Sequence, residues 1–238
     1  MHIMGIRTIS RKSFGEQEEL VYLSKFSGKR HKFFFIVERI YKKFINSKDG
    51  RLKSVLEIIN RINPKSILEI GSGTFLIYNF LPVTIKNKCQ YSICEVNPDK
   101  VKYIADTCKE VKVFCADALK LPFENDSFDL VFSKGVLHHI DHNEKKIRKK
   151  RRIEYLTESK RVLKKNGVGF VMDVDYQPAK FSNLFWHVLH KKILFEGEHN
   201  FSNREELEDF FRISGYRDIS SKEFDTFKGV YYYVEGKK

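Results

Sequence analysis

Three acidic residues stand within or just after short apolar runs in the first half of the chain. Glu69 lies in the run SILEI, Glu95 ends the run YSICE, and Asp117 follows the run VKVFC. A carboxylate can accept hydrogen bonds from an ammonium group, from both hydroxyls of a ribose, or from an exocyclic amino group. The three acids together therefore indicate a site for a nucleoside that carries a positive charge and presents no phosphate.

Gly71 and Gly73 follow the first of these runs, where they could form a tight turn against a ligand. Glycine permits backbone conformations and close approaches that other residues resist. A dinucleotide-binding turn would need a small residue at position 76, where this chain has Leu76. A carboxylate as near as Glu69 would also repel a pyrophosphate. Both features disfavour a dehydrogenase and favour a cofactor with a cationic end, such as S-adenosylmethionine.

Two neighbouring histidines, His138 and His139, lie just past another apolar run, at 129–133. An imidazole titrates close to neutral pH and can accept a proton as a general base. His138 is the stronger candidate for that role, and the alternative is that the pair only caps a turn. Pairs of histidines three apart occur at 139 and 142 and at 187 and 190, but no third ligand accompanies them, so we expect no metal site.

The elements that would position these residues alternate between strand and helix. Apolar runs typical of buried parallel strands occur at 66–70, 91–95, 111–115, 129–133 and 168–174. Helical patterns occur before and between them and again near the end, at 52–62, 98–110, 144–165 and 203–215, and two final runs predict a closing hairpin. This order predicts a doubly wound α/β sheet, in which ligands bind at the carboxyl ends of the strands.

The net charge of +13 is concentrated in two segments. Residues 25–53 hold ten Lys and Arg against two acids, and residues 145–165 hold eleven against two. Such segments could attract phosphates, an acidic substrate or an anionic surface, and the alternative is a solvated helix face. No apolar run reaches the roughly 18 residues of a membrane span, and the first residues lack a signal-peptide pattern, so we expect a cytoplasmic protein.

Four stretches carry a resemblance to a known family: ILEIGSGTF, CEVNPDKVKYI, CADALKLPFENDSFDLVFSKGVLHHI and LTESKRVLKKNGVGFVMDV. They resemble the class I S-adenosylmethionine-dependent methyltransferases, in particular the group that includes quinone-biosynthesis and other small-molecule methyltransferases. The resemblance covers residues 64–176. It implies a Rossmann-like seven-stranded sheet with an antiparallel last strand, S-adenosylmethionine as cofactor and S-adenosylhomocysteine as product.

The resemblance also implies a role for each residue near the cofactor. Glu69 would orient the glycine turn and reach the methionine ammonium, Glu95 would bind the ribose, and Asp117 would bind the adenine amino group. The other implied cofactor contacts are Gly71, Ser72, Gly73, Val96, Asn97, Ala118, Ser133 and Lys134. The family often has a further glycine at position 75, where this chain has Phe75, which puts the tightness of the turn in question.

The acceptor site is expected in the segments outside this core. We predict an N-terminal helical cap at 1–63 and a methyltransferase domain at 64–238 that carries a helical lid insertion at 176–200. Candidate acceptor-binding residues are Tyr22, Arg30, His31, Tyr176 and Trp186, and the alternative is that the aromatic members of this set form hydrophobic core.

We predict a methyltransferase that moves its methyl group by in-line displacement to a small-molecule acceptor, with alignment supplying much of the catalysis. One alternative is an RNA methyltransferase that uses the basic run KKIRKKRR at 145–152 to follow a phosphate backbone. A further alternative is a cofactor-binding scaffold without catalysis.

Overall fold

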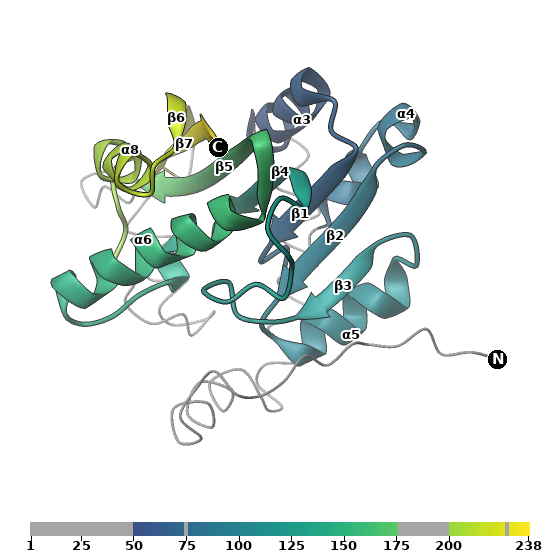
Figure 1. Ribbon diagram of the computed structural model, residues 1–238, viewed down its shortest axis with the longest axis horizontal. Coiled ribbons are helices and arrows are strands. Elements are labelled where there is room, and N and C mark those ends of the chain that lie inside the picture. The colour runs from purple at the N-terminus through teal and green to yellow at the C-terminus, as the bar shows by residue number, and fades with distance from the viewer. Residues whose placement is uncertain (1–49, 74–75, 176–199, 227–228) are drawn as a thin grey trace.

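The computed structural model describes residues 50–73, 76–175, 200–226 and 229–238. Seven strands form one sheet in the order β3-β2-β1-β4-β5-β7-β6 (Figure 1). Only β7 runs antiparallel to its neighbours β5 and β6. The strands are β1 (Ser66–Ile70), β2 (Gln90–Glu95), β3 (Lys112–Cys115), β4 (Phe128–Lys134), β5 (Leu163–Asp175), β6 (Arg217–Thr226) and β7 (Gly229–Lys237). This topology confirms the predicted doubly wound sheet with an antiparallel last strand.

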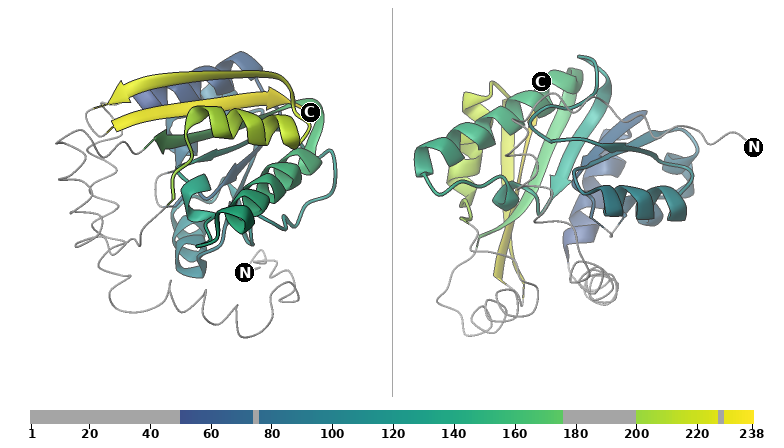
Figure 2. Two further views of the ribbon diagram at one scale, coloured as in Figure 1. Left: turned by 90° about the vertical axis from the view of Figure 1, so that its left-hand side faces the viewer. Right: turned by 90° about the horizontal axis from the view of Figure 1, so that it is seen from below.

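Helices cover both faces of the sheet (Figure 2). They are α3 (Gly50–Ile62), α4 (Val83–Lys86), α5 (Pro98–Thr107), α6 (Lys145–Val162) and α8 (Arg204–Ile213), with short 3-10 helices η1 (Ile77–Phe80) and η2 (Leu137–His139). Successive strand residues point to opposite faces. In β1, Ile67 therefore joins the cluster with α3, η1, α4 and α5, while Leu68 and Ile70 join the cluster with α6 and α8.

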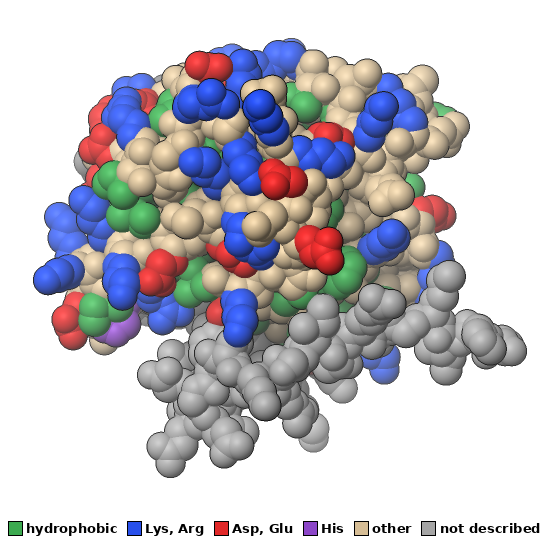
Figure 3. All heavy atoms as spheres, viewed as in Figure 1, with side chains coloured by type: hydrophobic (Ala, Val, Ile, Leu, Met, Phe, Trp, Pro, Cys, Tyr) green, Lys and Arg blue, Asp and Glu red, His purple; other side chains and the backbone are tan. Residues whose placement is uncertain are grey.

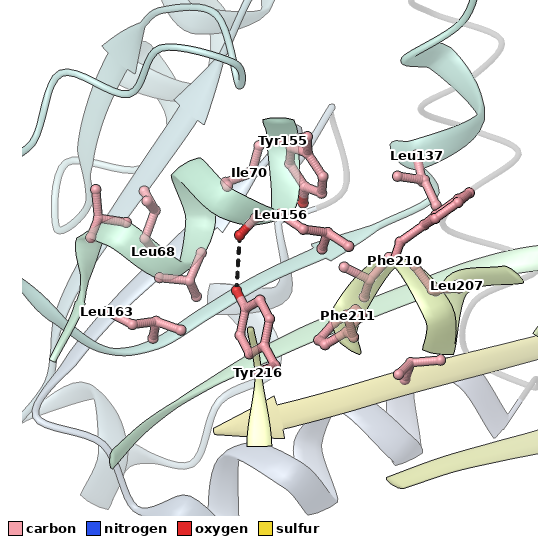
Figure 4. Packing of buried hydrophobic residues seen from close by; sticks show 14 of the residues in the cluster. Leu68, Ile70, Leu137, Tyr155, Leu156, Leu163, Leu207, Phe210, Phe211 and Tyr216 are labelled. Carbon is pink, nitrogen blue, oxygen red and sulfur yellow. Dashed lines mark hydrogen bonds between the residues drawn. The ribbon is translucent and has the colours of Figure 1, made fainter. Parts of the chain in front are cut away.

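The packing of α6 and α8 against the sheet depends on one close backbone approach. Tyr216 follows α8 and lies so near Gly169 of β5 that a Cβ there would come within 2.6 Å of its ring. The Tyr216 hydroxyl reaches α6 and donates a hydrogen bond to the Leu156 carbonyl at 3.3 Å (Figure 4). Glycine at position 169 is thus what allows the tyrosine to pack between strand and helix.

Two helices begin where local sequence signals predict. Asn97 caps α5 by accepting hydrogen bonds from the Asp99 and Lys100 amides, and Pro98 occupies the first turn. Asn203 caps α8 in the same way through the Glu206 amide. Gly215, with φ of +77°, follows the end of α8 in the left-handed conformation that glycine favours.

The helix predicted at 144–165 is wrong at its end, because α6 stops at Val162 and Leu163 already belongs to β5. The stretch that follows, Lys164 to Asn166, reads as helix in sequence, but Asn166 has a positive φ of +63° and cannot continue one. Lys164 instead forms an ion pair with Asp129 of β4 at 3.0 Å.

Within the described parts of the chain, no helix combines the length and the apolar character needed to cross a bilayer. Helix α3 lies inside the predicted N-terminal cap, yet its buried residues Val55, Ile58 and Ile59 pack in the same cluster as the sheet. The predicted division at residue 63 and the lid at 176–200 stay predictions, since 1–49 and 176–199 lie outside the described residues.

Candidate active site

The glycine turn after β1 has the conformation that its sequence predicts. Gly71 and Gly73 have φ values of +67° and +59°, in the left-handed region. The Gly71 amide donates to the Cys94 carbonyl of β2 at 2.7 Å. A Cβ at position 71 would meet Cγ2 of Val136 at 2.5 Å. Position 71 therefore requires glycine both for its backbone angle and for its contact with the loop after β4.

Glu95 holds this turn from the neighbouring strand. Its carboxylate is buried and accepts one hydrogen bond from the Gly73 amide and another from the Asn97 amide, each at 3.1 Å. The predicted ribose-binding carboxylate is thus fixed between the glycine turn and the start of α5. The buried Asn97 caps α5, while Val96 between them is half-buried.

Glu69 is almost fully buried and accepts a hydrogen bond from the hydroxyl of Tyr91 at 2.7 Å. Burial, followed by the adjacent Glu69 charge, raises the pKa of Tyr91 well above its ordinary value, so this tyrosine stays a donor. Tyr91 also packs edge-to-face on Tyr78 at 5.3 Å between ring centroids. Glu69 is therefore positioned beneath the turn by a partner that the sequence analysis did not identify.

Asp117 lies half-buried after β3 and accepts a hydrogen bond from the Leu119 amide at 2.9 Å. Burial raises the pKa of Asp117, and the Leu119 amide and the Arg151 guanidinium oppose the rise. The Nε atom of Arg151 is buried without a hydrogen-bond partner among the described residues. Ala118 belongs to the cluster on the α6 face. A desolvated carboxylate beside an unsatisfied donor fits the polar edge of an adenine, which offers both a donor and acceptors.

Ser133 and Lys134 end β4 beside the glycine turn, because Ser133 pairs with Ile70 in the sheet register. Ser133 is fully buried, and its hydroxyl accepts a hydrogen bond from the Tyr155 hydroxyl of α6 at 2.7 Å. Lys134 is half-buried and pairs with Met172 of β5. The structure thus brings these two residues to the same sheet edge as Gly71.

His138 forms a dyad with Asp173, an acid of β5 that the sequence analysis missed. The ring Nδ1 of His138 lies 2.7 Å from one carboxylate oxygen of Asp173, and the His138 amide donates to the other at 3.1 Å. The side chains are 12% and 2% exposed. Burial alone would raise the pKa of Asp173, but the charge of His138 and hydrogen bonds from its ring, from its amide and from the Val174 amide lower it.

The two predicted histidines differ in burial and in their contacts. His139 is exposed, and its ring packs against that of His138 at 4.1 Å between centroids. The ring of Phe201 also packs near that of His138, at 5.2 Å between ring centroids. Asp173 could have been found by the signal that marked Glu69, a carboxylate inside an apolar strand run.

The predicted acceptor-binding residues Tyr22, Arg30, His31, Tyr176 and Trp186 lie outside the described residues, as does Phe75. No group of three His, Cys, Asp or Glu side chains with metal-binding geometry occurs within the described ranges. All four cysteines are free thiols.

Residues 68–171 match the family described as Methyltransferase domain, Methyltransf_11. The tRNA (carboxymethyluridine(34)-5-O)-methyltransferase alkbh8 of Xenopus tropicalis is 35% identical over 81 residues, which are 33% of this chain and 12% of that protein. The chain therefore spans only a small part of the length of this curated relative.

Solved structures share the fold at lower identity. A S-adenosylmethionine-dependent methyltransferase from Thermotoga maritima, a possible histamine N-methyltransferase, aligns with a TM-score of 0.60 and 20% identity over 86% of this chain and 98% of its own. Phosphoethanolamine N-methyltransferase 2 of Haemonchus contortus, solved with S-adenosylmethionine, aligns with a TM-score of 0.57 and 16% identity over 78% of this chain and 52% of its own.

The family match spans the strands that carry the glycine turn, Glu95, Asp117 and His138. This chain is a class I S-adenosylmethionine-dependent methyltransferase. The match to the methyltransferase-domain family covers residues 68–171, and S-adenosylmethionine is the cofactor.

Proposed function

We propose that this enzyme methylates an oxygen or nitrogen atom that loses a proton in the reaction, and that His138 receives this proton. The observation that carries the proposal is the 2.7 Å contact between His138 Nδ1 and Asp173. When bound, S-adenosylmethionine supplies an electrophilic methyl group on its sulfonium. Glu69, Glu95, Asp117 and the glycine turn are the residues that would hold it.

The dyad determines which ring nitrogen of His138 carries the proton. Asp173 is a carboxylate with a lowered pKa and can only accept hydrogen bonds. The proton of a neutral imidazole is therefore held on Nδ1, and the lone pair is on Nε2. The second hydrogen bond, from the His138 amide to Asp173 at 3.1 Å, holds the backbone of the short helix η2 that carries the ring.

The loop that carries His138 packs against the turn that would bind the methionine part. Val136, two residues before His138, fills the space where a Cβ of residue 71 would lie. The Gly135 amide donates to the Met172 carbonyl of β5 at 2.8 Å and holds the loop on the sheet. These contacts support a base next to the methyl donor, as proton abstraction requires.

Our first candidate acceptor is a small molecule, as expected from the sequence. The names of the Thermotoga and Haemonchus structures give small amines as acceptors of those proteins, which supports this class. The cytoplasmic location, the lid and the five acceptor-binding residues remain part of this proposal.

RNA is the second candidate acceptor, and two observations favour it. The Xenopus relative is named as a tRNA methyltransferase, and its identity of 35% exceeds that of the structures compared above. In addition, α6 carries a dense group of basic residues next to the loop of His138.

The first test is binding of S-adenosylmethionine and S-adenosylhomocysteine by calorimetry, with NAD as control and Glu95→Ala as the site variant. We expect both compounds to bind, NAD not to bind, and the variant to bind neither. Transfer of labelled methyl to a panel of small amines and hydroxyl compounds, and to total tRNA, then decides between the acceptor classes. Unchanged turnover in His138→Gln would end the general-base proposal while leaving the cofactor site intact.

A further inference from the structure

Helix α6 begins with seven basic residues in eight positions, KKIRKKRR at 145–152. Four of the seven have contacts within the protein. Arg152 is buried and bonds to Ile140, Asn200 and Ser202, and Arg148 donates to the His142 carbonyl at 2.7 Å. Lys150 pairs with Glu154 at 3.7 Å, and Arg151 faces Asp117.

The other three, Lys145, Lys146 and Lys149, are exposed and have no partner among the described residues. They stand in the first two turns of α6, where the helix dipole is positive and where lysine is unfavourable. The first turn contains no acid. Lys145 and Lys149 are also four residues apart, a spacing at which like charges destabilise a helix. No hydrogen bond or ion pair within the described residues offsets this unfavourable placement.

The neighbouring helix α8 shows the opposite arrangement. It has Glu205 and Glu206 in its first turn and Arg212 in its last, as the dipole favours. Arg212 pairs with Glu208 at 2.9 Å and with Asp209 at 2.6 Å. The charges of α8 therefore stabilise the helix that carries them, whereas Lys145, Lys146 and Lys149 at the start of α6 do not.

The basic start of α6 adjoins the candidate base. Figure 3 shows Lys and Arg side chains gathered at the edge of the molecule where α6 begins, at the left of the view. The loop between η2 and α6 joins them to His138, and Arg148 and Arg152 bind the carbonyls of His142 and Ile140 in that loop. An anion bound on this face would lie beside the loop that follows His138.

We propose that the exposed face of α6 formed by Lys145, Lys146 and Lys149 binds the phosphate backbone of an RNA acceptor. This inference rests on the second candidate function above. Flexible lysines on one helix end suit repeated, sequence-independent phosphate contacts. A membrane surface fits less well, because an interfacial helix needs an exposed apolar face. The large hydrophobic residues exposed within the described ranges are Phe80, Val83 and Ile213, and none lies on α6.

The test removes the three charges from the full-length protein as Lys145→Gln, Lys146→Gln and Lys149→Gln together. The matched control removes three exposed charges elsewhere, as Lys102→Gln, Lys165→Gln and Lys222→Gln. Fluorescence anisotropy with unfractionated tRNA at several salt concentrations measures binding. We expect the α6 variant to bind at least about tenfold more weakly and its salt dependence to fall by about 2 in log–log slope, while the control stays within about twofold of the parent.

Thermal unfolding and S-adenosylmethionine calorimetry accompany both variants. The α6 variant should bind the cofactor as the parent does and should unfold at an equal or higher temperature, since unfavourable charges have been removed. Equal loss of tRNA binding in both variants, or an α6 variant that loses binding to phosphatidylserine vesicles but not to tRNA, would overturn the proposal. Loss of tRNA binding in the α6 variant alone supports the proposed RNA-binding surface. Absence of methyl transfer to tRNA is a separate outcome, which would remove RNA as the acceptor without removing the binding surface.

Discussion

Asp173 holds His138 at two points, through the ring Nδ1 at 2.7 Å and through the backbone amide at 3.1 Å. The two residues are 35 positions apart in sequence, one on β5 and the other on the short helix after β4. The ring and its supporting backbone are therefore positioned by a single carboxylate.

Asp173→Asn should lower kcat at least about tenfold and leave cofactor affinity unchanged, because the amide no longer fixes the imidazole tautomer. The acid limb of the pH–rate profile should also move to lower pH, since the carboxylate that stabilises protonated His138 is gone. Steady-state kinetics across pH measures both effects. If Asp173→Asn and His138→Gln lower kcat independently, so that the double variant shows the product of the two losses, the dyad does not act as a unit.

Gly71→Ala should destabilise the protein by about 1–2 kcal/mol and weaken S-adenosylmethionine binding at least tenfold. The alanine would be strained at φ of +67°, and its Cβ would meet Val136 at 2.5 Å. Adding Val136→Ala should restore part of the stability, because it removes the contact but not the strain. Denaturant unfolding and calorimetry on the single and double variants measure this, and full recovery in the double variant would show that the backbone angle is unimportant.

Tyr91→Phe should cost about 1–3 kcal/mol, because it leaves the buried carboxylate of Glu69 without its tyrosine donor. We also expect weaker cofactor binding, since Glu69 lies directly before the glycine turn. Tyr216→Phe is a suitable control, because it also removes a buried tyrosine hydroxyl, one that donates to the Leu156 carbonyl of α6 and not to Glu69. Cofactor affinity that falls equally in both variants would contradict a specific role for Tyr91.

Asp129→Asn should destabilise the protein at neutral pH by about 1–3 kcal/mol. Burial alone would raise the pKa of Asp129. Hydrogen bonds from Lys164, from the Ser66 hydroxyl and from the amides of Lys65 and Ser66 outweigh burial and lower this pKa below its ordinary value of 3.8. The stability from a lowered carboxylate pKa is present above that ordinary value and is lost as pH falls through the lower folded value. The difference between parent and variant should therefore shrink as urea unfolding is repeated from pH 6 to about pH 3.

The strands were predictable to within one or two residues where an apolar run is bounded by polar residues, as with β1 and β2. The start of β5 was not, because Lys164 and Lys165 continue a helical pattern by composition. The pairing of Leu163 with Phe128 of β4 is what shows the strand. The short helices η1 and α4 were also missed, since each has only four residues and is set by its packing after the glycine turn.

The candidate site also has a part that could be predicted from the sequence and a part that could not. Glu69, Glu95 and Asp117 could be identified because each marks the end region of one strand, and strand ends meet at one edge of a parallel sheet. Contacts between side chains of different elements could not be predicted from the sequence. The hydrogen bonds from His138 to Asp173, the bond from the Tyr91 hydroxyl to Glu69 and the position of the Arg151 guanidinium near Asp117 all depend on sheet register or on the rotation of α6.

Glu95 accepts both of its hydrogen bonds from the protein backbone, at Gly73 and at Asn97. These two bonds tie the turn at Gly73 to the start of α5 through one carboxylate. Binding of S-adenosylmethionine should involve little loss of backbone entropy, and affinity should vary mainly through the dissociation rate. We expect product inhibition by S-adenosylhomocysteine, because it keeps the ribose and the amino-acid part that Glu95 and the glycine turn would hold.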